Sequence, residues 1–336
     1  MTQTAENLEW NRRRILALGA ATVTARPLSA WSSASFPSRP VRLVIPFAAG
    51  GGVDNLARLI GIQLSQHWGQ PVIVENKPGA AGLIAGEAVS KATPDGHTIL
   101  FGTTSSMLTN RYLYQKLPYD PLRDLTPLVR TCLAPITLVV TADTPAQNLQ
   151  EFMSWIQANK GKLSFGSYGI GSHGQLALAT ISRLANAELA HVAYKGEMPM
   201  IQDMLGSQIK IGMGSLVNLK PHIDAGKLHP LAVTGPLRLP QLPNVPTFIE
   251  SGYKQDALSI VGWLAIAGPK DMPANVIRDW SIAANLALSH SECQSRMIAS
   301  GFVPMDNDTP EKFGQQWTQE APIWGDLLKA AGVQPN

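Results

Sequence analysis

Four turns rich in glycine and hydroxyl residues carry the chemistry that this sequence offers. They span residues 46–54, 76–82, 102–106 and 166–172, and each lies where an apolar run ends and a helical pattern begins. Such a turn presents free backbone N–H groups and the positive end of a helix, which together suit a carboxylate or a phosphate. We expect the first turn to need a positive φ and close backbone approach at Gly51. The turns predict a site that holds a small anion.

Catalytic and metal-binding patterns are weak around these turns. Ser172 and His173 are adjacent, which ordinarily points their side chains apart, and no Gly-x-Ser-x-Gly elbow surrounds them. We expect a helix-capping serine followed by a surface histidine. The histidines are scattered, and Cys132 and Cys293 are expected to be unpaired, buried thiols. The interpretation is a binding protein that is not an enzyme and uses no metal or other cofactor.

A nucleotide site is the first competing hypothesis. Gly50 and Gly52 follow a strand pattern, and Glu75 ends the next strand, where a ribose-binding acid would lie. The dinucleotide fingerprint nevertheless fails at its third glycine, where Asn55 stands, and no Gly-Lys-Ser/Thr sequence follows any of the turns. An α/β enzyme acting on a carboxylate or nucleotide substrate stays as the alternative.

Two charged residues beside the turns allow two interpretations each. Asp54 either caps the first helix and orders its loop, or faces the ligand, where its charge would repel an anion. Lys195 either attracts the ligand or is simply solvated. The sequence leaves both questions open.

Composition and the N-terminus indicate an exported globular protein. The chain has 336 residues, of which 45% are hydrophobic and 15% charged; its net charge is +3, and no basic stripe marks a nucleic-acid surface. Arg12-Arg13-Arg14 precedes a short apolar stretch, and small residues follow at 32–34. This pattern predicts a signal peptide over residues 1–34, which resembles a twin-arginine signal.

Apolar patterns alternate between strand and helix along the rest of the chain. The expected strands span residues 41–46, 71–75, 98–101, 136–140, 163–165, 190–192, 209–211, 231–233 and 260–267. The expected helices span residues 53–67, 81–91, 148–159, 175–187, 274–289 and 310–331. This order is typical of βαβ units. Two such units, joined near residues 138 and 262, would place the four turns beyond the carboxyl ends of the strands, in a cleft between two lobes.

Several motifs in combination resemble one known family, the periplasmic substrate-binding proteins of tripartite tricarboxylate transporters, also called Bug receptors. The similarity covers nearly all of residues 36–334. The motifs are Phe36-Pro37-Ser38-Arg39-Pro40, Pro46-Phe47-Ala48-Ala49-Gly50-Gly51-Gly52-Val53-Asp54, Val74-Glu75-Asn76-Lys77-Pro78-Gly79-Ala80-Ala81-Gly82, Pro94-Asp95-Gly96-His97-Thr98, Val192-Ala193-Tyr194-Lys195-Gly196, and Ala225-Gly226-Lys227-Leu228 followed by Leu231-Ala232-Val233-Thr234.

The resemblance implies an α/β fold of the two-lobed, Venus-flytrap type, in which each lobe is a mixed, mostly parallel sheet flanked by helices. Lobe 1 would comprise residues 35–138 and 262–336, and lobe 2 residues 139–261. It implies a monomer in the periplasm that captures a small organic acid or amino acid between the lobes and delivers it to the membrane subunits of a transporter. No nucleic-acid partner is implied.

The resemblance also implies which residues contact the ligand. The full set of candidates combines these residues with those chosen from the turns by their chemistry. It consists of Phe47, Ala48, Ala49, Gly50, Gly51, Asp54, Thr103, Thr104, Ser105, Ser106, Gly169, Ile170, Gly171, Ser172, His173, Gly174 and Lys195. Two departures matter: Met213-Gly214 stands where the family usually has an apolar residue followed by Asp, and His173 is shifted within the fourth turn. The identity of the ligand is therefore less transferable than the fold.

Overall fold

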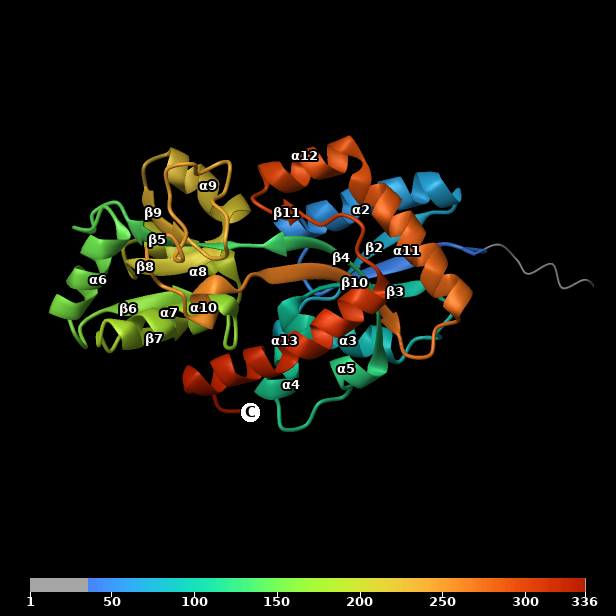
Figure 1. Cartoon of the computed structure of the whole chain (residues 1–336), viewed down its shortest axis with the longest axis horizontal. Coiled ribbons are helices and arrows are strands. Elements are labelled where there is room, and N and C mark those ends of the chain that lie inside the picture. Colours follow the sequence, from blue (N-terminus) through green and yellow to red (C-terminus); the bar gives the residue numbers. More distant parts are fainter. Residues whose placement is uncertain (1–35, 336) are drawn as a thin grey trace, which may run out of the picture. The chain divides into compact units, whose positions relative to one another are not determined.

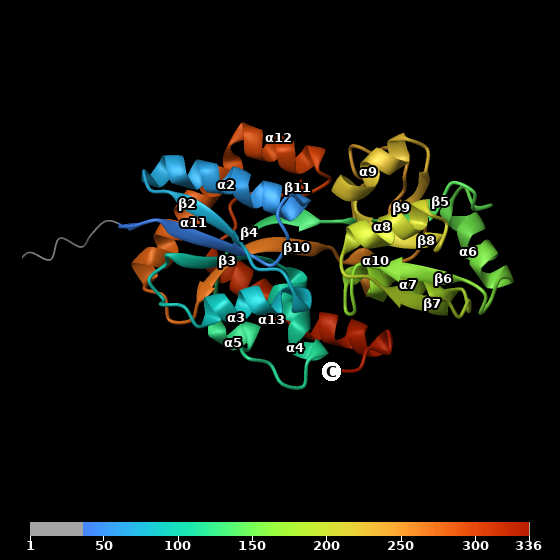
Figure 2. The same cartoon turned by 180° about the vertical axis from the view of Figure 1, so that it is seen from behind.

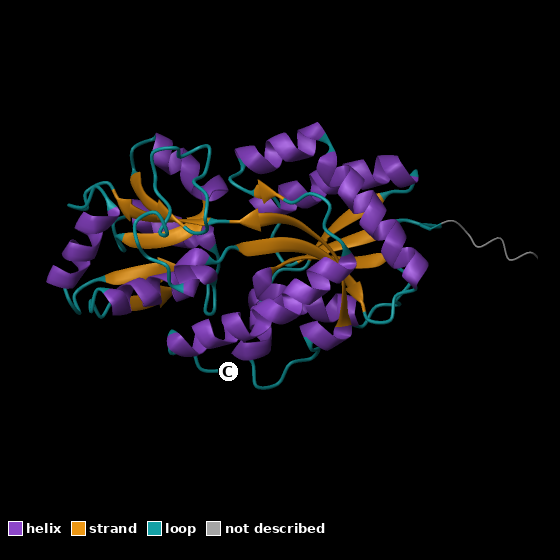
Figure 3. Cartoon of the chain, in the orientation of Figure 1, coloured by secondary structure: helices purple, strands orange, loops and turns teal. Residues whose placement is uncertain are grey.

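The computed structural model describes residues 36–335, apart from the side chain of Ala80. The predicted signal peptide, with Arg12-Arg13-Arg14, lies outside the described residues and stays a prediction. The described elements form two β-sheets, each with helices on both faces (Figure 1, Figure 3).

The first sheet has the strand order β11-β4-β10-β3-β1-β2. Its strands are β1 (Val41–Ile45), β2 (Val72–Asn76), β3 (Thr98–Thr103), β4 (Leu125–Ala134), β10 (Gly262–Pro269) and β11 (Val303–Pro304). Its helices are α2 (Gly52–Trp68), η1 (Ala80–Gly82), α3 (Leu83–Ser90), η2 (Ser105–Thr109), α4 (Asn110–Leu113), α5 (Pro121–Asp124), α11 (Ala274–Ser289), α12 (Ser291–Ala299) and α13 (Pro310–Ala330).

Alternating side chains divide the core of this sheet between its two faces. Leu43 of β1 and Leu264 of β10 pack with α2, α11 and α12. Their neighbours Val44 and Ala265 point the other way and pack with α3 and α13. This alternation follows from the two-residue period of a strand, and the sheet is buried on both faces because helices cover each of them.

The second sheet has the strand order β7-β6-β8-β5-β9. Its strands are β5 (Ile136–Thr141), β6 (Ser164–Ser167), β7 (Ala190–Ala193), β8 (Ile211–Ser215) and β9 (Leu228–Val233). Its helices are α6 (Leu149–Ala158), α7 (His173–Leu184), α8 (Glu197–Leu205), α9 (Leu216–Asp224) and α10 (Asp256–Ser259). Helices α6 and α7 pack on one face, and α8 and α9 on the other (Figure 2).

Local chemistry explains where several helices begin and end. Asn148 caps α6 by accepting a hydrogen bond from the backbone N–H of Glu151, whose carboxylate accepts one from the N–H of Gln147. Thr309 caps α13 in the same way, with Pro310 as its first residue. Helix α2 ends at Gly69, whose φ of 64° is in the left-handed region that favours glycine.

The chain passes between the sheets along neighbouring strands. Strand β4 ends at Ala134 and β5 begins at Ile136, so only Pro135 separates the two sheets on the outward path. Strand β10 brings the chain back, and it is hydrogen-bonded to β4 in antiparallel pairing (Figure 1). The two crossing segments therefore lie side by side.

The fold class is confirmed, since both sheets are mixed and flanked by helices. The expectation that the sheets are mostly parallel is wrong. Strand β1 pairs in parallel with β2 and β3, and β6 with β7 and β8. Strands β4, β5 and β10, however, pair antiparallel with all their named neighbours. These are the strands that carry the chain between the sheets. Their direction is opposite to that of the neighbouring strands with which they pair.

Nine further elements were not predicted: β4, β11, η2, α4, α5, α8, α9, α10 and α12. Proline obscures three of them, because Pro127 interrupts the apolar pattern of β4, Pro199 lies in the first turn of α8, and Pro221 lies inside α9. Cys132 and Cys293 are both free and buried, as expected. Among residues 36–335, no helix combines the length and the apolar character needed to cross a membrane.

Candidate ligand-binding site

Three of the four turns meet at the carboxyl ends of the parallel strands β2, β1 and β3. A Cβ atom placed on Gly82 would lie 3.0 Å from the Cβ of Pro46 and 2.5 Å from the Cβ of Ser106, so the three chain segments are in direct contact. The side-chain amide of Asn110 also donates to the carbonyl of Ala81 at 3.1 Å. The sheet therefore assembles the turns that the sequence placed far apart.

Asp54 orders the first of these turns. Its carboxylate accepts hydrogen bonds from the backbone N–H of Gly50, from the Arg58 guanidinium at 2.9 Å, and from the Asn76 amide. Burial by itself would raise the pKa of Asp54, but these hydrogen bonds lower it below its ordinary value. The structure thus gives Asp54 the loop-ordering role, one of the two that the sequence allowed.

The glycines of the first turn differ from the expectation. The expectation that Gly51 needs a positive φ is wrong, because its φ is −76°, which any residue adopts. Gly50 has the positive φ, at 88°. Phe47, Ala48 and Ala49 of the same turn are exposed, and the carbonyl of Phe47 accepts a hydrogen bond from Asn76.

Hydroxyl groups of the third turn fall into two pairs. Thr104 is buried and is hydrogen-bonded to the backbone of Trp263, where the returning strand β10 begins. Ser106 is also buried, and its hydroxyl is hydrogen-bonded to the backbone of Thr103. Thr103 and Ser105 are partly exposed. These two are therefore the more accessible of the four hydroxyl residues in the turn.

The fourth turn starts α7. Ser172 caps this helix by accepting from the N–H of Gln175, as expected. The expected surface position of His173 is wrong: the ring is buried against Trp324, and its Nε2 is 2.9 Å from the carbonyl oxygen of Ala257. Burial lowers the pKa of His173 to about 4, which keeps the ring neutral at physiological pH.

The other residues of this turn are small or exposed. The N–H of Gly171 donates to the side-chain oxygen of Gln175 at 2.7 Å. Gly169 is partly exposed, Ile170 is exposed, and Gly174 is buried. A Cβ atom on Gly174 would lie 3.1 Å from Cε1 of Tyr168, so this glycine permits close packing of the tyrosine ring.

Two segments that sequence reasoning missed lie beside the fourth turn. Glu197 begins α8, and its carboxylate accepts from the backbone N–H of Ser215 at 2.9 Å and from the side-chain amide of Asn218 at 2.6 Å. Lys195, two residues earlier, is exposed. Sequence reasoning missed Glu197 because α8 and α9, which bring Glu197, Ser215 and Asn218 together, were not predicted as helices.

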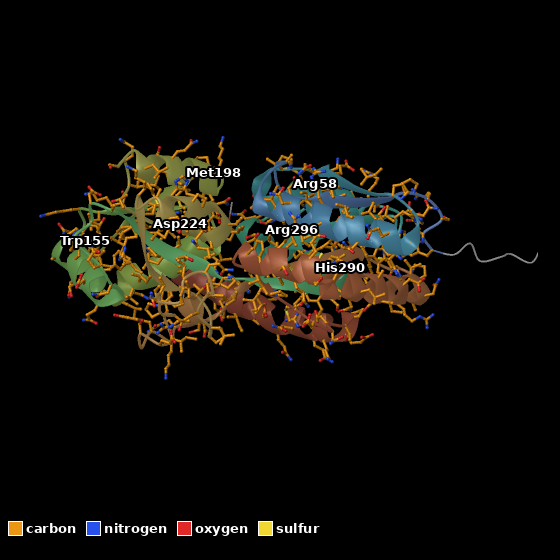
Figure 4. The ribbon with its side chains drawn as sticks, turned by 90° about the horizontal axis from the view of Figure 1, so that it is seen from above. Arg58, Trp155, Met198, Asp224, His290 and Arg296 are labelled. Carbon is orange, nitrogen blue, oxygen red and sulfur yellow. The ribbon has the colours of Figure 1, made fainter. Side chains whose placement is uncertain are left out.

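The turn-bearing edges of the two sheets meet. A Cβ atom on Gly52, at the start of α2, would lie 2.8 Å from Cγ1 of Val217, at the start of α9. A Cβ atom on Gly171 would lie 2.5 Å from a methyl group of Leu113 in the first sheet. In Figure 4, Arg58 of α2 and Met198 of α8 lie on the facing sides of the two groups of elements. The first and fourth turns therefore lie where the edges of the two sheets meet, and the second and third turns contact the first.

The polar groups of this region are mostly backbone amides and hydroxyls. Among the described residues, no group of three or more His, Cys, Asp or Glu side chains is arranged to hold a metal ion. A surface pocket of about 320 Å³ lies elsewhere, with walls from α7, β7 and the end of α13, and it includes none of the candidate residues. What the region between the sheets offers is backbone N–H groups and hydroxyls.

Two α/β sheets joined by paired crossing strands, with donor-rich turns between them, define the class of two-lobed solute-binding proteins. Residues 56–333 match the tripartite tricarboxylate transporter family receptor. This match covers well over half of the chain, so the protein belongs to that family, and the resemblance of its motifs is confirmed. The family consists of solute-binding receptors and not of enzymes.

Related proteins share both sequence and fold along nearly their whole length. The periplasmic binding protein BugD is 33% identical, with a TM-score of 0.80 over 90% of this chain and 100% of its own. Rpa4515 of R. palustris, solved with adipate, is 30% identical, with a TM-score of 0.82 over 90% and 100%. MatC (Rpa3494) of Rhodopseudomonas palustris, solved with malate, is 29% identical, with a TM-score of 0.78 over 87% and 100%. A UPF0065 protein from the tcbD-tcbE intergenic region of Pseudomonas sp. (strain P51) is 33% identical over 97% of this chain and 96% of its own.

Proposed function

We propose that this protein is a periplasmic receptor that captures a small carboxylate-bearing metabolite between its two sheets and delivers it to a transporter of the tripartite tricarboxylate type. One observation carries the proposal. Helices α2 and α3 start at Gly51 and Gly82 without a side-chain cap, so their first N–H groups are free to bind an anion. The adipate and malate bound to two relatives support this chemistry.

The proposed contacts come from the candidate residues of both sheets. The first-turn backbone at residues 47–51 and the partly exposed hydroxyls of Thr103 and Ser105 would hold the carboxylate from the first sheet. The fourth turn, at residues 169–174, and Lys195 would close over the ligand from the second. We propose that the protein acts as a monomer, whose lobes close by hinge motion where the chain crosses near residues 138 and 262.

A ligand screen tests this function. Mono-, di- and tricarboxylates and amino acids are added to the purified protein, and an increase in melting temperature identifies binders, because ligand binding stabilises the native state by mass action. Calorimetry should then give a Kd in roughly the micromolar range, about −8 kcal/mol. Small-angle scattering with the saturating acid should show compaction. If no acid binds, or if binding causes no compaction, the proposed receptor mechanism is wrong.

A matched pair of variants tests the site, and two further assays test the alternatives. Ser105→Ala removes a partly exposed hydroxyl of the third turn and should weaken binding, whereas Ser154→Ala removes an exposed hydroxyl of α6 and should not. Conversion of the bound acid into a product would favour the α/β enzyme instead. Loss of cellular uptake of that acid when the gene is deleted would support delivery to a transporter, and unchanged uptake would contradict it.

A further inference from the structure

The carboxylate of Glu197 is held by neutral groups only. It accepts from the backbone N–H of Ser215 at 2.9 Å, from the Ser215 hydroxyl at 2.5 Å, and from the Asn218 amide at 2.6 Å. A carboxylate has about four acceptor positions, so one position on Oε1 remains. The residue is half-buried, and a Cβ atom on Gly214 would lie 3.4 Å from its carboxyl carbon.

Glu197 has no cationic partner among the described residues. Asp54, the acidic residue on the other side of the region, is paired with Arg58 at 2.9 Å. Lys195 is two residues from Glu197, yet it is exposed, and no described ion pair joins the two. The second sheet therefore contributes a negative charge without a described cationic partner. Its hydrogen-bond partners Ser215 and Asn218 flank Val217, which faces Gly52 of the first turn.

Among the helices of the second sheet, α6 and α7 have side-chain caps, whereas α8 and α9 have none. Ser172 caps α7 by accepting from the N–H of Gln175. Glu197 lies in the first turn of α8, where Pro199 removes one donor, and it accepts from the backbone N–H of Ser215, the residue that precedes α9. The starts of α2 and α3 in the first sheet have no side-chain caps. The two sides of the region therefore differ in the pairing of their carboxylates, because Asp54 is paired with Arg58 and Glu197 has no described cationic partner.

We propose that Glu197 is a specificity-determining residue that selects a ligand with an ammonium or other N–H donor group facing the second sheet. This inference rests on the proposed function, in which the first sheet holds the ligand carboxylate. A second carboxylate at that position would meet Glu197 at short range, where like charges repel strongly in a partly buried site. An ammonium group there would pair with Glu197 and donate to its remaining acceptor position. Such selection by repulsion as well as attraction is a general route to specificity.

The test uses acids that differ only in one group. The probes are butyrate, 2-aminobutyrate, 4-aminobutyrate and succinate, with hexanoate, 2-aminohexanoate, 6-aminohexanoate and adipate as the longer series. Their Kd values are measured by calorimetry with the purified full-length protein and with the Glu197→Gln variant. In the wild-type protein we expect an amino-bearing acid to bind at least about 10-fold more tightly than the dicarboxylate of the same length. In Glu197→Gln that preference should fall at least about 10-fold.

The ratio of affinities separates selection from a structural role. If Glu197 only joined α8 to α9, its replacement would weaken all acids alike and leave the ratio unchanged, which would overturn the inference. Glu151→Gln is the matched control, because Glu151 also binds a backbone N–H at a helix start but lies on α6. It should leave the ratio as in the wild type. If the acids bind but the dicarboxylates and the amino acids have equal Kd values, only this inference fails. If none of the acids binds, the proposed function fails, and this inference fails with it.

Discussion

Single residues in the first turn have separable roles. Gly50 has a φ of 88°, a conformation that costs a residue with a Cβ atom about 1–2 kcal/mol, and its N–H is held by Asp54. Gly51 has an extended conformation, and a Cβ atom there would come no closer than 3.9 Å to another residue. The positive φ is therefore needed at one position and not at its neighbour.

We predict that Gly50→Ala weakens ligand binding by about 10-fold, because roughly 1.4 kcal/mol of backbone strain corresponds to that factor. Gly51→Ala is the matched control and should bind within a factor of about two. Calorimetry with an acid identified in the screen gives both affinities. Equal affinities for the two variants would show that the conformation of Gly50 does not hold the site together.

His173 gives the protein a pH-dependent stability. A histidine in the unfolded chain titrates near 6.5, whereas burial lowers the pKa of His173 to about 4 in the folded protein. Between these values the unfolded state binds more protons, so the free energy of unfolding falls as the pH drops. The loss begins near pH 6.5 and is complete near pH 4, with a limit of about 3 kcal/mol.

We predict that His173→Gln, which does not titrate, removes much of this pH dependence. Denaturant unfolding of both proteins at a series of pH values between 4 and 7 measures it. The difference in stability between wild type and variant should shrink as the pH falls, since only the wild type takes up this proton on unfolding. His191, whose pKa is also lowered by burial, is common to both proteins and cancels. Parallel curves would rule out the assignment to His173.

At the scale of elements, the starts of α2 and α9 meet across the two sheets. Gly52 lies inside the helical range of α2 and has no positive φ to justify a glycine. Its missing side chain is instead explained by Val217, whose Cγ1 would lie 2.8 Å from a Cβ atom on Gly52. A β-branched side chain is stiff and moves aside poorly. Gly52 thus permits the close approach of the sheets.

We predict that Gly52→Ala weakens ligand binding about 10-fold without lowering the stability of the unliganded protein. Adding Val217→Ala should restore the affinity, because the second change makes room for the new methyl group. The four proteins of this double-mutant cycle are compared by calorimetry and thermal unfolding. If Gly52→Ala binds as well as the wild type, the contact between α2 and α9 does not matter for ligand capture.

At the scale of the whole molecule, export decides whether the protein can act as a receptor. We predict that residues 1–34 are removed and that the mature chain begins near residues 31–35. Replacing Arg12 and Arg13 by Lys should slow export if the twin-arginine route is used, because lysine lacks the planar guanidinium that this route recognises. Cell fractionation and N-terminal sequencing measure both. Uncleaved protein found only in the cytoplasm would contradict the signal peptide and the periplasmic role.

The sequence by itself determined most elements and the kind of chemistry. Turns such as residues 46–54 can be predicted from their glycine and hydroxyl content. Helices such as α2, α11 and α13 can be predicted from the period of their apolar residues, because both signals are local. The family could be predicted because its motifs are also short, contiguous stretches of the sequence. These signals sufficed to predict a two-lobed anion-binding protein.

Only the tertiary structure decided which members of those turns are free to act. Asp54, Thr104, Ser106 and Ser172 are engaged within the protein. Glu197, which no motif marked, is positioned by Ser215 and Asn218 about twenty residues away. The antiparallel crossing strands and the burial of His173 also depend on partners distant in the chain. A hydrogen bond or a buried contact between remote segments leaves no periodic trace in the sequence, so these features exist only once the sheets have brought the segments together.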